Sequence, residues 1–61
     1  MEEFYTPKEI QELLKLSKNT AYRLINQPDF PKLKIGGSIR VPKEEFIKFI
    51  KRYIGKDFDL I

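Results

Sequence analysis

The sequence predicts a small α+β domain, mainly α, with the order helix, helix, two-stranded hairpin, helix. Two short apolar patterns of helical period lie only a couple of residues apart, an alternating stretch with two glycines follows, and a third helical pattern comes last. A chain of 61 residues can support one core. We therefore expect a single domain over residues 1–55 and a C-terminal tail over residues 56–61.

The first helix is expected from about Pro7 to Leu14 or Lys15. Thr6 suits the N-cap position, and Glu9 three residues later would complete a capping box. Apolar residues then recur at helical spacing and predict a buried face of Ile10, Leu13 and Leu14.

A second helix is expected from about Lys18 to Asn26, with Ser17 as its N-cap. Its predicted buried face consists of Ala21, Leu24 and Ile25. Because so few residues separate the two helices, they should cross at a steep angle, which is the geometry of a helix-turn-helix. Pro28 is expected to end the second helix.

Residues 32–41 alternate with a period of two around a pair of glycines and predict a β-hairpin. A two-residue Gly-Gly turn would place Ile35 opposite Ser38 and would put the apolar residues of the two strands on opposite faces. We instead expect Ile35 to lie opposite Ile39, across a three-residue loop or a shorter loop with a bulge. This register would bury every apolar residue of the hairpin.

A third helix is expected to open at Pro42 and to stop at Gly55. Its predicted buried stripe consists of Phe46, Phe49, Ile50, Tyr53 and Ile54. The tail that follows alternates acidic and apolar residues, a pattern that leaves open whether it docks on the domain.

Positive charge is concentrated in the middle of the chain. Residues 15–43 contain seven basic side chains and one acid, whereas residues 1–14 carry a charge of −3 and residues 44–61 are neutral, for a net charge of +3. A basic segment on a helix and a hairpin is typical of a nucleic-acid-binding surface.

Catalysis, metal binding and membrane insertion are disfavoured. The chain has no cysteine and no histidine, and its adjacent acids, Glu2 with Glu3 and Glu44 with Glu45, lie at the terminus or at a helix start. We therefore expect neither enzyme activity nor a cofactor. No apolar run approaches the ~18 residues of a membrane span, and the acidic N-terminus disfavours secretion, so we expect a cytoplasmic protein.

The outward face of the second helix should carry side chains that can donate hydrogen bonds, namely Lys18, Asn19, Tyr22, Arg23 and Asn26. A major groove about 12 Å wide admits such a helix. Asn19 suits adenine, and Arg23 suits guanine or a phosphate. The hydroxyls of Ser17, Thr20 and Tyr22 suit phosphate oxygens.

On the hairpin, the expected register points Lys34 and Arg40 outward, directly opposite each other. Like charges in this arrangement destabilise a sheet, and a bound phosphate would relieve the repulsion. The alternative interpretation of both surfaces is simple solvation, with Ser17 serving only as a helix cap.

Several motifs occur in an order that is more specific than any one of them. They are Tyr5-Thr6-Pro7-Lys8-Glu9-Ile10, Leu13-Leu14, Ser17-Lys18-Asn19-Thr20-Ala21-Tyr22-Arg23-Leu24-Ile25, Phe30-Pro31, Lys34-Ile35-Gly36 and Ile39-Arg40-Val41-Pro42. With them, residues 5–54 resemble the excisionase-family DNA-binding domain, a small winged helix-turn-helix related to the MerR class. The resemblance implies a recognition helix at Ser17–Asn26 in the major groove and a wing at Lys34–Arg40 against the backbone or minor groove. The wing tip, Gly36, Gly37 and Ser38, would offer backbone amides.

The resemblance implies a sequence-specific double-stranded DNA-binding protein that acts as an excisionase, bending DNA and steering an integrase or recombinase. Neighbouring copies of the chain on DNA are a further implied partner. A small transcriptional regulator with the same DNA-binding surface is the alternative role. The alternative from another class is a protein-interaction module that docks through Phe58, Leu60 and Ile61 of the tail.

Overall fold

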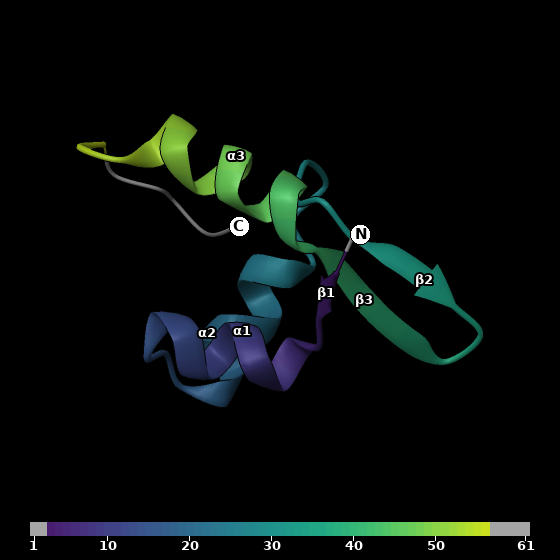
Figure 1. Ribbon diagram of the computed structural model, residues 1–61. Helices are drawn as coiled ribbons and strands as arrows, with labels where there is room; N and C mark the ends of the chain where they lie inside the picture. Colours follow the sequence, from purple (N-terminus) through teal and green to yellow (C-terminus); the bar gives the residue numbers. More distant parts are fainter. Residues whose placement is uncertain (1–2, 57–61) are drawn as a thin grey trace.

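The computed structural model describes residues 3–56, which form three helices and a three-stranded antiparallel sheet (Figure 1). The elements are β1 (Phe4–Tyr5), α1 (Pro7–Leu14), α2 (Lys18–Ile25), β2 (Leu33–Ile35), β3 (Ser38–Pro42) and α3 (Lys43–Tyr53). The helices gather on one side, and the β2–β3 hairpin extends away from them. The predicted class and order are confirmed, with β1 as an additional element. The predicted role of the tail cannot be tested, because residues 57–61 lie outside the described residues.

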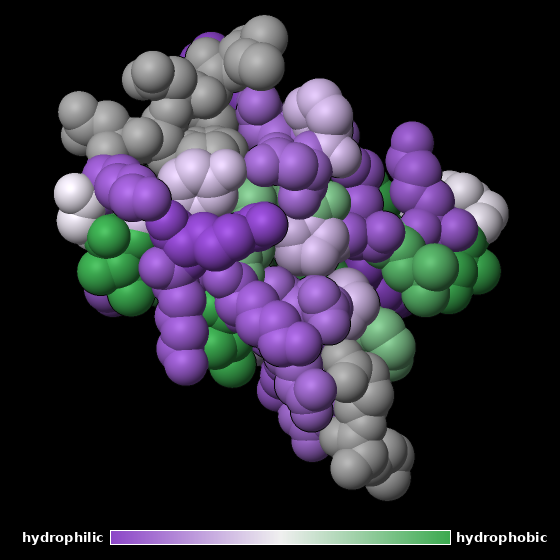
Figure 2. All heavy atoms as spheres, turned by 90° about the horizontal axis from the view of Figure 1, so that it is seen from above, coloured by the Kyte–Doolittle hydropathy of each residue, from purple (hydrophilic) through white to green (hydrophobic). Residues whose placement is uncertain are grey.

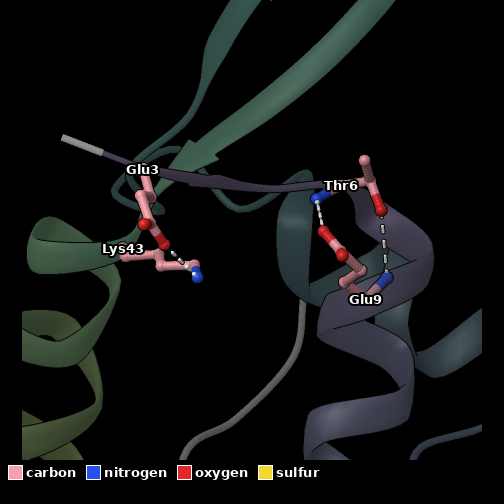
Figure 3. Close-up of polar contacts among 4 residues, drawn as sticks. All are labelled: Glu3, Thr6, Glu9 and Lys43. Carbon is pink, nitrogen blue, oxygen red and sulfur yellow. Dashed lines mark hydrogen bonds and ion pairs between the residues drawn. The ribbon is translucent and has the colours of Figure 1, made fainter. Parts of the chain in front are cut away.

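Helix α1 begins as its capping signals predict. The Thr6 hydroxyl accepts a hydrogen bond from the Glu9 N–H at 3.2 Å, and the Glu9 carboxylate accepts the Thr6 N–H at 2.8 Å (Figure 3). Ile10 is fully buried, but Leu13 is 51% exposed, so its predicted burial is wrong. Leu13 lies at the rim of a groove between α1 and α3 that no described side chain fills.

The turn between α1 and α2 depends on one left-handed residue. Lys15 has φ 54° and ψ 46°, and the Leu16 N–H donates to the Gln11 carbonyl at 3.0 Å. This arrangement satisfies a helix-end carbonyl and reverses the chain within two residues. Ser17 can then cap α2 directly.

The core is mainly aliphatic and aromatic, and comprises Ile10, Leu24, Ile25, Phe30, Val41, Phe46 and Phe49. Phe30 was not among the predicted core residues, yet its ring centroid lies 5.0 Å from that of Phe49 and 6.1 Å from that of Phe46. The Tyr53 hydroxyl donates to the Asp29 carboxylate at 3.1 Å, and burial together with this bond raises the pKa of Tyr53. The segment after α2 is thereby fastened to α3.

β3 is the central strand of the sheet, in the order β1-β3-β2. Phe4 lies opposite Pro42 and Tyr5 opposite Val41, so the N-terminal segment covers the free edge of β3. Next to this pairing, the Lys43 N–H donates to the Glu3 carbonyl at 2.9 Å.

Helix α3 follows β3 without a loop. Pro42 is its N-cap and the last residue of β3, so the helix begins one residue later than predicted. Gly55, with φ 81°, lies just past its end, as predicted. Ile54 is 70% exposed, which makes its predicted burial wrong, because α3 extends past the helices beneath it.

Candidate nucleic-acid interface

Helix α2 starts at a well-formed side-chain cap. Ser17 has extended backbone angles, and its hydroxyl accepts the Thr20 N–H at 3.2 Å and donates to the Thr20 hydroxyl at 3.0 Å. In this arrangement the Ser17 proton is engaged, whereas the Thr20 hydroxyl still has a proton to donate. Of these two candidates, Thr20 is therefore better placed to bind a phosphate.

The two faces of α2 divide as predicted. Its buried residues are Ala21, Leu24 and Ile25. Its exposed residues are Lys18, Asn19, Tyr22 and Arg23, and Asn26 at the C-cap is also exposed. Tyr22, the aromatic residue expected at the surface, is 38% exposed. The helix thus presents a continuous polar face with its apolar side fixed in the core.

A depression of about 360 Å³ lies between α1 and the start of α2 and is lined by Lys8, Gln11, Lys18 and Tyr22. Its walls contain two lysines and no acid, so it suits an anion. Lys8 and Gln11 were not predicted as site residues. The signal that could have identified them is their i, i+3 spacing on the side of α1 away from its apolar residues.

The C-terminal end of α2 is held by a buried glutamine. Gln27 is 5% exposed, and its side-chain amide donates to the Arg23 carbonyl at 2.9 Å. The Lys32 ammonium donates to the Gln27 carbonyl at 3.3 Å. These bonds fix the backbone that carries Arg23, and they give Lys32 a structural contact.

The hairpin has the register that we did not expect. Ile35 pairs with Ser38, Lys34 with Ile39, and Leu33 with Arg40. Gly36 has φ 58°, which suits the two-residue turn that this register requires. The predicted pairing of Ile35 with Ile39 is wrong. That prediction assumed that all apolar residues of the hairpin are buried, but the hairpin extends beyond the helices, so the core does not cover its outer part.

This register separates the two basic residues of the hairpin. Lys34 shares a face with Ile39, whereas Arg40 shares the opposite face with Leu33 and Ile35. Lys34 and Arg40 are therefore not paired, and the predicted repulsion between them does not arise. Leu33 and Ile35, expected to be buried, are 46% and 59% exposed.

The sheet face that carries Arg40 is mainly apolar. A depression of about 200 Å³ on it is lined by Phe4, Thr6, Leu33, Ile35 and Arg40. Seen from above, hydrophobic surface appears where the hairpin projects at the right (Figure 2). Arg40 donates from Nη1 to the Ile39 carbonyl at 2.9 Å, and its other donors remain available. We call this surface the outer sheet face.

The first turn of α1 borders both candidate surfaces. Thr6 lines the depression on the outer sheet face, and Lys8, two residues later, lines the depression beside α2. Phe4 and Thr6 were not predicted as site residues. They could be identified only from the pairing of β1 with β3, which carries no local sequence signal.

Two cations outside the candidate surfaces form ion pairs. Among residues 3–56, Lys43 pairs with Glu3 at 2.7 Å (Figure 3), and Lys48 pairs with Glu45 at 3.6 Å. The bond with Lys43 lowers the pKa of Glu3, and the same bond raises the pKa of Lys43. Within the same range, no acid pairs with the cations of α2 or of the hairpin.

Residues 3–56 hold no group of three or more metal-ligating side chains, and none of their helices is long and apolar enough to cross a membrane.

A family model described as a helix-turn-helix domain matches residues 4–53, from β1 to the end of α3. Neither a curated protein nor a solved structure shows a significant match to the chain.

Proposed function

The chain belongs to the helix-turn-helix domain family and is a DNA-binding protein of that type, and we propose that it recognises a specific sequence of double-stranded DNA through α2. One observation carries this proposal: α2 exposes an unbroken polar face and buries its apolar face. Eight residues make a rod of about 12 Å, a length that a major groove accommodates.

Two residues on the exposed face of α2 are suited to contact bases, Asn19 in its first turn and Arg23 in its last. Asn19 can bond adenine, and Arg23 can bond guanine or a phosphate. Lys18, with Lys8 and Gln11 of α1 beside it, suits a phosphate of the flanking backbone. Asn26 lies at the far end of the helix, where we expect a weaker contact.

The hairpin is proposed to contact the DNA backbone through the outer sheet face. Arg40 supplies charge there, and the apolar residues around it suit deoxyribose. Lys34 lies on the other face, so it would contribute mainly to the general positive field. The tip residues Gly36, Gly37 and Ser38 are exposed and would offer backbone amides.

The proposed role follows the resemblance to excisionases: the protein would bind beside a recombination site in the cytoplasm, bend DNA and steer an integrase. A transcriptional regulator is the second candidate, because an apolar groove away from α2 offers a surface on which two copies could pair. Excision factors typically bind tandem sites, whereas regulators more often bind palindromes. Selection of bound sites from random duplex DNA would distinguish direct from inverted repeats.

The decisive test of DNA binding is a titration with the selected duplex at several salt concentrations. We expect log affinity to fall with log salt at a slope near −0.9 per phosphate contacted, with about five contacts per monomer. Arg23→Ala should weaken binding, whereas Lys48→Ala should not, since Lys48 is paired with Glu45 on α3. Equal losses from the two variants, or no salt dependence, would reject the proposed surface.

The interaction-module alternative predicts a different result. Deletion of residues 56–61 would then abolish the main binding activity, whereas on the DNA proposal the affinity for a single site should survive.

A further inference from the structure

The depression between α1 and α2 brings together four side chains that can all donate a hydrogen bond. Lys8 and Gln11 lie one helical turn apart on α1, and they form one wall. Lys18 and Tyr22 lie one turn apart on α2, and they form the other. A phosphodiester has only acceptor atoms, so it matches this set of donors, and the volume of about 360 Å³ admits it.

The charge around the depression is positive. Lys8 and Lys18 are exposed, and neither forms an ion pair among residues 3–56. Lys18 is also the first residue of α2, whose first turn contains no acid, so the depression borders the positive end of that helix dipole. Of the acids nearby on α1, Glu9 accepts the Thr6 N–H. Glu12 is exposed and does not line the depression, so it weakens the positive field there without occupying a donor.

We propose that this depression holds one phosphate of the DNA backbone, and that the contact positions the start of α2 for base recognition. This role rests on the proposed DNA binding and assigns it a fixed backbone contact. Lys18 precedes Asn19, the residue suited to adenine, so a phosphate held at Lys18 fixes where the first turn of α2 sits in the groove. Lys8 and Gln11 hold the same phosphate from the side of α1, and they are therefore positioning residues for Asn19.

Gln11 distinguishes a fixed contact from general attraction, because its side chain is uncharged. A lysine attracts any nearby phosphate through its field, so a loss of affinity without that lysine does not by itself show a contact. A neutral amide acts on a phosphate through a directional hydrogen bond at short range. Arg23 lies more than one turn further along α2 than Asn19, so base recognition by Arg23 should depend less on this phosphate.

Replacement of single backbone phosphates of the selected duplex by neutral methylphosphonates tests the contact. We expect one position at which Lys8→Ala causes no loss of affinity beyond that of the replacement itself. At all other positions Lys8→Ala should weaken binding several-fold, and on the unmodified duplex it should reduce the salt slope by about 0.9. Lys51→Ala is the matched control, since Lys51 is exposed and unpaired among residues 3–56 but lies on α3. It should leave affinity unchanged, and a loss from Lys8→Ala that is the same at every position would reject the fixed phosphate.

Gln11→Ala tests the positioning role. We expect lower affinity, an unchanged salt slope, and a several-fold smaller discrimination between bases at the position that Asn19→Ala identifies. Discrimination at the position recognised by Arg23 should be kept. Glu12→Gln is the neighbouring control: it removes an acid outside the depression, so it should raise affinity slightly and leave discrimination unchanged. Thermal unfolding checks that Gln11→Ala is folded, as expected for alanine in a helix.

The positioning role and the proposed function fail through different results. Unchanged discrimination in folded Gln11→Ala would overturn the positioning role, and equal losses from Lys8→Ala and Lys51→Ala would overturn the phosphate contact. Both results leave salt-dependent, sequence-specific binding by the unchanged protein intact. The proposed function fails instead when the unchanged protein shows no such binding to any duplex.

Discussion

Helix α2 and the β2–β3 hairpin both carry unpaired cations, but on surfaces of opposite character. On α2 the cations lie among other hydrogen-bonding groups, above an apolar face that is fully in the core. On the hairpin, Arg40 lies among Leu33, Ile35 and Phe4, and Lys34 occupies the other side. The exposed groups of α2 are of types that can bond to base edges, whereas the hairpin offers charge and apolar surface but few such groups.

The two regions also differ in how they are held. α2 is fixed by its cap, by three buried side chains and by Gln27 at its end. The hairpin is fixed at its base by β1 and is free of the helices toward its tip. More contacts thus hold α2 than hold the tip of the hairpin, which fits the proposed roles of base contact for α2 and DNA-backbone contact for the hairpin.

The largest effect should follow a change to the base-reading face. We expect Asn19→Ala to relax base preference at one position, at a cost of roughly 1–3 kcal/mol for the preferred base and little for other sequences. Asn26→Ala, at the C-cap of the same helix, is the matched control and should cost much less. Binding to a set of duplexes with single base changes would measure both; equal effects would break the distinction between the two ends of α2.

A smaller effect should separate the two cations of the hairpin. Arg40→Ala should lower affinity for all sequences alike by about tenfold and reduce the salt slope by about 0.9, as loss of one phosphate contact does. Lys34→Ala should lower it less, because Lys34 is on the opposite face. If Lys34→Ala had the larger effect in salt titrations, the outer sheet face would not be the side that meets DNA.

Stability should depend on one of the two hairpin glycines. Gly36→Ala places a side chain at φ 58° and should destabilise the fold by about 1 kcal/mol. Gly37→Ala should be nearly neutral, since its φ is not positive and no atom lies within 4 Å of an added Cβ. Urea unfolding of both variants measures the difference, and equal midpoints would argue against the two-residue turn.

The smallest effect concerns the base of the hairpin. The bond to Lys43 lowers the pKa of Glu3 below its ordinary 4.5, so its stabilisation is present above that pH and is lost as the pH falls through the lowered value. Glu3→Gln should reduce stability slightly at pH 7. Thermal unfolding at pH 7 and pH 3 should show this difference disappear in acid; a constant difference would mean that the ion pair is not its cause.

The difference between α2 and the hairpin also explains which parts of the fold could be predicted from the sequence. The bounds of α1 and α2 follow from caps and apolar spacing within a few residues, and the structure confirms them to within one residue. The exposed face of α2 follows directly from the spacing of its apolar residues, whereas its proposed DNA contacts remain predictions. Lys8 and Gln11 were missed because their proximity to Lys18 depends on how the two helices cross.

The hairpin register could not be obtained by requiring apolar residues to be buried. Phe30 and the other aromatic residues already fill the core, so Leu33 and Ile35 are not needed there. β1 was missed because a two-residue strand has no periodicity and its partner lies far along the chain. The local Gly-Gly signal for a two-residue turn was the better guide.

The direct passage from β3 into α3 has a mechanical consequence. Pro42 belongs to the strand and Lys43 to the helix, and Glu3 and Phe4 hold this joint from outside by backbone bonds and an ion pair. The hairpin and α3 are therefore joined without a flexible loop, and the N-terminal segment bonds to their junction. A movement of the hairpin should therefore turn α3 with it, and removal of Glu3 and Phe4 should loosen the junction, because its backbone bonds and ion pair would be lost.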